Sequence, residues 1–223
     1  MSYRILIYTY NLLFCAFFAT ALLGCGQGGG EESFRSANSP SMTVVKLRVV
    51  IAGNAISEDL LHQMLEISRS RFLNMGIALE LAELWADEPE PDEMLELESF
   101  WKRQSYDYWK SRWDSPESEA LLTIVYTRPL ISNGVTYYGG WSEGECRPLG
   151  GFALIHTKPG HLLKNALADS HEKGHLLGAS HDQSLDPPSI MHPDAGAYLG
   201  ETEDAEFSPK SRKEIQRCIE NIN

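Results

Sequence analysis

Three histidines in one short segment restrict what this chain can fold into. The segment reads HEKGHLLGASHD. If residues 162–177 are helical, His171 and His175 lie four positions apart on one face, with about 5–6 Å between their Cβ atoms. Gly178 can then adopt a left-handed conformation and end the helix, which lets His181 turn back toward the other two. The pattern predicts a helix, a glycine turn and one shared three-histidine site.

These residue types suit a catalytic zinc ion. Three neutral imidazole nitrogens at roughly 2.0–2.1 Å leave the fourth position of a tetrahedral zinc open, as in catalytic rather than structural sites. A surface helix that merely carries histidine and glutamate is the alternative for a bare HExxH. The added glycine and third histidine argue against it. We therefore predict one Zn²⁺ held by His171, His175 and His181, with Glu172 beside it as the general base.

A methionine turn follows the long motif. Residues 189–193 read SIMHP. The HExxHxxGxxH pattern with a downstream methionine turn resembles the metzincin clan of zinc endopeptidases. The resemblance implies an α/β (α+β) catalytic domain with a twisted mixed sheet, an antiparallel edge strand, an active-site helix and a C-terminal helix. It also implies that Met191 packs beneath the metal and that Glu172 serves the hydrolysis of peptide bonds.

Within that clan, the details resemble the adamalysin (reprolysin) family, with a turn similar to that of matrixins. Asp182 follows the third histidine, as in adamalysins. Pro193 stands where astacins place a tyrosine that can reach the metal. In adamalysins a cysteine upstream of the motif pairs with one in the C-terminal helix, which implies a disulfide between Cys146 and Cys218. Two free buried thiols are the alternative.

The segment before the active-site helix is expected to bind substrate. Residues 151–157 read GFALIHT. By the resemblance this is the edge strand, to which an extended peptide adds as a further strand, with Gly151, Phe152, Ala153 and Leu154 as the substrate positions. A protein or peptide is therefore the expected substrate.

Lys173 departs from the motif, because relatives usually carry an apolar residue there. Its stem could pack while the ammonium reaches solvent, or the residue could mark a repurposed site. A zinc-binding lipoprotein without hydrolysis therefore stays open as an alternative to the endopeptidase. We predict that His62, His156 and His161 are not ligands.

The N-terminus has the form of an export signal. An apolar stretch follows Arg4 and ends in Leu-Leu-Gly-Cys at Cys25. This ending resembles the bacterial lipobox, which implies a signal peptide over residues 1–24 and a lipid on Cys25. A spanning helix or a plain signal peptide is the alternative. Gly26 as the second mature residue fits the outer membrane better than the inner one, so we expect an exported, lipid-anchored protein of the bacterial cell envelope.

The remaining chain divides into a tether and one domain. Residues 25–42 are rich in glycine, serine and charge, which is typical of a flexible tether. Residues 43–223 are enough for a single domain with its own core. The net charge of −12 argues against nucleic acid as a partner. We expect a monomer that contacts the membrane through its lipid anchor only.

The domain shows a recognisable order of elements. We expect strands at residues 44–52, 77–85, 121–126 and 151–157, and helices at residues 57–75, 162–177 and 209–222. Residues 100–113 carry six aromatic side chains. They are expected to form an amphipathic helix packed on the sheet, and the alternative is an exposed surface of an adhesin that binds glycan or protein.

Overall fold

The computed structural model describes residues 3–4, 42–95, 104–113, 122–132, 134–144, 146–183, 189–195 and 205–221. The predicted signal peptide, the tether and Cys25 fall outside these ranges, apart from residues 3–4 and 42, so their boundaries stay predictions. Among the described residues, no helix has the length and apolar character needed to cross a bilayer.

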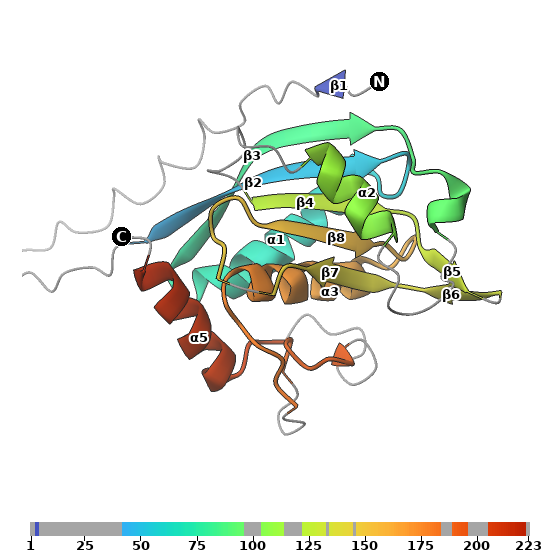
Figure 1. The fold of residues 1–223 in the computed structure, drawn as a ribbon. Helices are drawn as coiled ribbons and strands as arrows, with labels where there is room; N and C mark the ends of the chain where they lie inside the picture. Colours follow the sequence, from blue (N-terminus) through green and yellow to red (C-terminus); the bar gives the residue numbers. More distant parts are fainter. Residues whose placement is uncertain are drawn as a thin grey trace, which may run out of the picture.

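A twisted mixed sheet forms the centre of the molecule (Figure 1). Its strands follow the order β1-β3-β2-β4-β8-β7. The four strands β3, β2, β4 and β8 are parallel, and β7 is antiparallel to β8. The bounds are β1 Tyr3–Arg4, β2 Thr43–Ala52, β3 Ile77–Asp87, β4 Leu122–Thr127, β7 Gly139–Ser142 and β8 Phe152–His156. A separate antiparallel hairpin pairs β5 (Leu130–Ser132) with β6 (Val135–Tyr137).

Helices cover both faces of the sheet (Figure 1). Helices α1 (Glu58–Leu73) and α3 (Leu162–Leu176) lie on one face, and α2 (Gln104–Trp113) lies on the other. A short 3-10 helix, η1 (Asp92–Met94), follows β3, and α5 (Pro209–Glu220) closes the chain. Apolar side chains therefore form two clusters, one on each face of the sheet, and the larger cluster includes residues of α1, α3 and α5. The predicted α/β fold class is confirmed.

Local signals account for most of these elements. Ser57 accepts a hydrogen bond from the backbone N–H of Leu60 and begins α1, and Ser208 caps α5 with Pro209 in its first turn. All six residues of β4 are buried, which fits its continuous apolar run in a parallel strand covered on both faces.

The aromatic segment packs on the sheet, as predicted. Helix α2 buries Trp109 completely, and Tyr106 meets Phe152 of β8 edge-on with ring centroids 5.3 Å apart. The same cluster includes Trp141 of β7. Residues 100–103 lie outside the described part of the chain. Because the described aromatic side chains are used in packing, this helix does not favour the adhesin alternative.

The predicted position of the edge strand was wrong. Strand β8 lies between β4 and β7, and its residues Ala153 and Leu154 have strand partners on both sides. All five residues of β8 are buried, as expected for an inner strand. The antiparallel edge is β7, whose sequence GGWS is poor in strand-forming residues. Of the four assigned substrate positions, Ala153 and Leu154 are therefore inside the sheet, Phe152 pairs with β4, and Gly151 precedes the strand.

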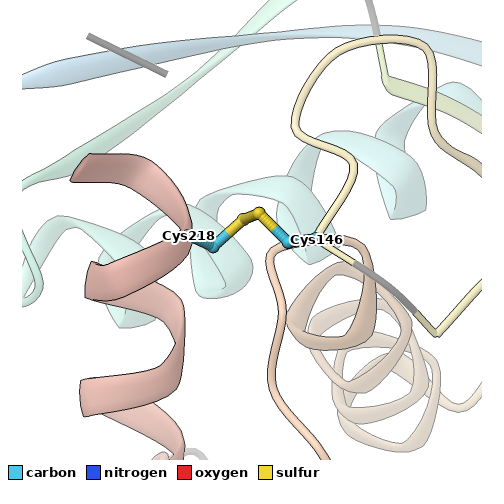
Figure 2. Close-up of a disulfide and its surroundings, with 2 residues drawn as sticks. All are labelled: Cys146 and Cys218. Atoms are coloured by element: carbon cyan, nitrogen blue, oxygen red, sulfur yellow. A yellow bond between two sulfur atoms is a disulfide. The ribbon is translucent and has the colours of Figure 1, made fainter. Parts of the chain in front are cut away.

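The implied disulfide is present. Cys146, in the loop after β7, bonds to Cys218 of α5 (Figure 2), across a sequence separation of 72 residues. The two cysteines also lie against the turn that follows α3, because a Cβ built on Gly178 would be 3.0 Å from the Cβ of Cys218. The bond thus ties α5 to the loop after β7, and it packs against the end of α3.

Replacing both Cys146 and Cys218 with serine is expected to lower the free energy of unfolding by roughly 4 kcal/mol, because the crosslink restricts the unfolded chain over a long loop. Urea unfolding of the two proteins measures the difference. A reducing agent should destabilise the parent by a similar amount and leave the double variant unchanged. A loss below about 1 kcal/mol would contradict this expectation.

Candidate metal centre

Helix α3 brings the first two histidines together. His171 and His175 are one helical turn apart, and their Nε2 atoms are 3.1 Å from each other. Each ring is oriented by a backbone carbonyl on its other side: His171 Nδ1 is 2.7 Å from the oxygen of Ile190, and His175 Nδ1 is 2.8 Å from that of Ala179. A carbonyl only accepts, so each Nδ1 carries the proton and each Nε2 offers a lone pair.

The turn after α3 delivers the third histidine. Gly178 has a φ of 93°, which glycine adopts readily, and its N–H donates to the oxygen of His175. The chain then reverses, so that His181 Nε2 lies 3.1 Å from His175 Nε2 and 3.3 Å from His171 Nε2. The predicted glycine turn is confirmed.

The three nitrogens fit a tetrahedral zinc ion. Ligands at 2.0–2.1 Å in tetrahedral geometry are about 3.3–3.4 Å from one another, close to the three measured separations of 3.1–3.3 Å. A metal ligand must be neutral imidazole. Burial lowers the pKa of His171 to about 4 and lowers the pKa values of His175 and His181. Among the described residues, these three histidines form the one group suited to hold a metal.

Glu172 is buried next to the ligands. Only 5% of it is exposed, and burial raises the pKa of its carboxyl to about 7. Its Oε2 accepts a hydrogen bond of 2.6 Å from the hydroxyl of Ser142 on β7. A carboxyl group whose pKa is near neutrality can both accept and return a proton at physiological pH.

Met191 packs against the inner side of α3. It is fully buried, and a Cβ built on Gly174 would lie 2.5 Å from its Sδ. The glycine in the second variable position of the motif is therefore needed for the turn to approach the helix. The oxygen of Met191 accepts from the N–H of Asp182, whose carboxylate accepts from Ser208 at the start of α5.

Comparisons with solved structures show a likeness of fold. No family model matches the sequence. Metalloproteinase-II from Bacteroides fragilis superimposes with a TM-score of 0.52 and 14% identity, over 80% of this chain and 53% of that one. Archaemetzincin from Methanopyrus kandleri superimposes with a TM-score of 0.51 and 16% identity, over 82% of this chain and 99% of that one. This chain has a metallopeptidase-like fold. It spans about half the length of the Bacteroides protein.

Lys173 lies in the interior of the molecule, which is unusual for a lysine. It is completely buried, so the proposal that its ammonium reaches solvent was wrong. Its Nζ lies 2.5 Å from Oδ2 of Asp169, one turn earlier on α3, and the hydroxyl of Tyr126 donates to the other carboxylate oxygen at 2.6 Å. Burial lowers the pKa of Lys173, and Asp169 opposes that shift. The lysine is thus part of a buried polar contact between α3 and β4.

The other histidines that were predicted not to be ligands are outside the three-histidine group. His62 is exposed on α1, and His161 precedes the first turn of α3. His156 is buried in β8, where its Nδ1 meets the oxygen of Arg128 at 2.8 Å and burial lowers its pKa to about 4. None of the three belongs to the metal-ligand group found among the described residues.

Two residues of the site were missed in the sequence. Gly140 and Ser142 of β7 both contact Glu172, across about 30 residues of chain. The alternation of β7 carried a signal, since residues two apart share one face of a strand. The glycine-rich sequence of β7 does not predict a strand, however, so the alternation alone does not reveal these contacts.

Proposed function

We propose that this chain is a zinc-dependent endopeptidase. One observation carries the proposal: three histidine Nε2 atoms 3.1–3.3 Å apart converge beside a buried glutamate. When bound, zinc supplies Lewis-acid polarisation of a carbonyl and lowers the pKa of water toward 7. The likeness to two metalloproteinase folds supports the same conclusion.

The chain's own residues would handle the protons. Glu172 accepts a proton from the attacking water and returns it to the nitrogen of the leaving amine. Its raised pKa, about 7, suits both steps near neutral pH. Ile190 and Ala179 hold the two helix histidines in the tautomer that directs Nε2 inward.

We infer that the substrate binds along β7. This strand ends the sheet in the described part of the chain, and its residues Gly140 and Ser142 adjoin Glu172. An extended peptide that pairs with the outer edge of β7 would have its backbone held beside the general base. The substrate strand predicted at residues 151–154 is thereby replaced by residues 139–142.

An adamalysin-like relationship with a matrixin-like turn belongs to the proposal as well. The disulfide between Cys146 and Cys218 supports it, as does Asp182 after the third histidine. The likeness to the two solved structures concerns the fold and does not test this subtype.

We further propose that the protein is a monomeric lipoprotein of the bacterial cell envelope, that a lipid on Cys25 anchors it, and that its substrates are proteins or peptides. The lipobox-like ending of the apolar N-terminal stretch supports it. The first long strand begins at Thr43, in agreement with a domain that starts after a tether. If Cys25 is the first mature residue, β1 is removed with the signal peptide and β3 becomes the other edge of the sheet.

Metal removal tests the proposed activity. The full chain should contain one zinc per molecule and cleave denatured casein. A chelator should reduce cleavage to background, and added Zn²⁺, but not Mg²⁺, should restore it, because three imidazoles suit zinc rather than a hard cation. Metal analysis and a fluorescent peptide assay measure both effects. One bound zinc with no cleavage of a diverse peptide library would instead support the inert zinc protein.

A further inference from the structure

Strand β7 presents two different faces. Gly140 and Ser142 contact Glu172 of α3. Trp141, between them, packs in the aromatic cluster with α2 on the opposite side of the sheet. Successive strand residues point to opposite faces. Helix α2 therefore packs against one face of β7, while Gly140 and Ser142 contact α3 on the other face.

The contact with β7 leaves the side chain of Glu172 little conformational freedom. The hydroxyl of Ser142 donates to Oε2 at 2.6 Å. A Cβ built on Gly140 would lie 2.4 Å from Cγ of Glu172 and 2.8 Å from both Cδ and Oε1. Real Cβ atoms do not approach other atoms this closely. The glycine therefore leaves the space that the glutamate side chain fills, and the serine holds one carboxylate oxygen.

We infer that Ser142 is a positioning residue for Glu172, and that Gly140 provides the space in which the glutamate is held. This inference rests on the proposed function, because it assigns a role relative to the general base. A carboxylate whose orientation is already restricted does not have to be ordered when substrate arrives, and such preorganisation lowers the barrier of the chemical step. Since the peptide is proposed to pair with the same strand, β7 aligns substrate and base together.

Three serine and threonine variants test this role by kinetics. Ser142→Ala is expected to lower kcat by about tenfold, the effect of losing one hydrogen bond to a charged group, with KM and zinc content unchanged. Ser142→Thr keeps the hydroxyl and should recover most of the loss. Thr136→Ala, on the exposed strand β6, is the control and should leave kcat unchanged. An unchanged kcat in Ser142→Ala, or an effect confined to KM, would overturn the inference.

A stability cycle tests the contact without any activity. In the zinc-free full chain, Gly140→Ala and Ser142→Ala should each lower the urea midpoint of unfolding. In a Glu172→Ala background both effects should largely disappear, because the side chain that needs the space and the hydrogen bond is gone. Equal effects in the two backgrounds would show that the residues do not act on Glu172.

The two experiments separate the possible failures. If the parent binds zinc but cleaves nothing, the proposed function fails, and the stability cycle still decides whether Ser142 and Gly140 hold the glutamate. If the parent cleaves peptides and the cycle is additive, the positioning role fails alone.

Discussion

Glu172→Gln is expected to reduce kcat/KM for peptide hydrolysis by a factor of about 10²–10⁴, the usual contribution of a general base. The amide keeps the size of the side chain and can still accept a hydrogen bond from Ser142, whose hydroxyl lies 2.6 Å from the carboxylate in the parent. Zinc content should not change, because the three Nε2 atoms belong to other residues. Steady-state kinetics on a fluorescent peptide, with metal analysis of the same samples, measures both quantities.

Glu80→Gln is a suitable control for that experiment. Glu80 is exposed on β3, so the same chemical change there should leave hydrolysis intact. Full activity of Glu172→Gln with one zinc bound would remove Glu172 from the mechanism and with it the proposed reaction course.

Lys173→Met is expected to lower the free energy of unfolding by about 3–5 kcal/mol, because it leaves the carboxylate of Asp169 buried without its cation. Both residues are fully buried, with Nζ and Oδ2 2.5 Å apart. Methionine keeps the apolar stem, so the lost charge rather than a cavity dominates the change. Urea unfolding of the zinc-free protein measures the loss.

A double variant distinguishes the unpaired charge from lost packing. Asp169→Asn together with Lys173→Met removes both charges and should regain much of the stability lost in Lys173→Met alone. Lys46→Met, at an exposed position of β2, should change stability by less than about 0.5 kcal/mol. If Lys173→Met were as mild as Lys46→Met, the buried ion pair would have no structural importance.

The main elements could be predicted because their signals are local. Strand β4 is a continuous apolar run, and α3 is defined by the histidine spacing and the glycine turn. Helix caps at Ser57 and Ser208 likewise depend on neighbouring residues only. The same holds for the metal ligands, all of which lie within one helix and its turn.

The missed features depend on tertiary contacts. Strand β7 has two glycines, and a Cβ on one of them, Gly140, would overlap the side chain of Glu172 on α3. A strand with such a constraint does not show the residues typical of strands. The hydrogen bond from Ser142 to Glu172 depends on how β7 is aligned with β8, which no local pattern specifies.

Lys173 is a different case. Asp169 precedes it by four residues, the spacing of an ion pair on one helical face. The pair was therefore visible in the sequence, but its burial was not. A lysine on a helix usually faces solvent, and only the packing of α3 against α1 and β4 shows that this one does not.

The bond between Cys146 and Cys218 closes residues 146–218 into a covalent ring. The three proposed metal ligands, the proposed general base and the methionine turn lie within that ring. A single nick between the two cysteines, whether from another protease or from a second copy of this chain, opens the ring but releases no fragment. The nicked molecule keeps its full mass until the disulfide is reduced, so proteolysis within the ring has to cut twice to remove any of these residues.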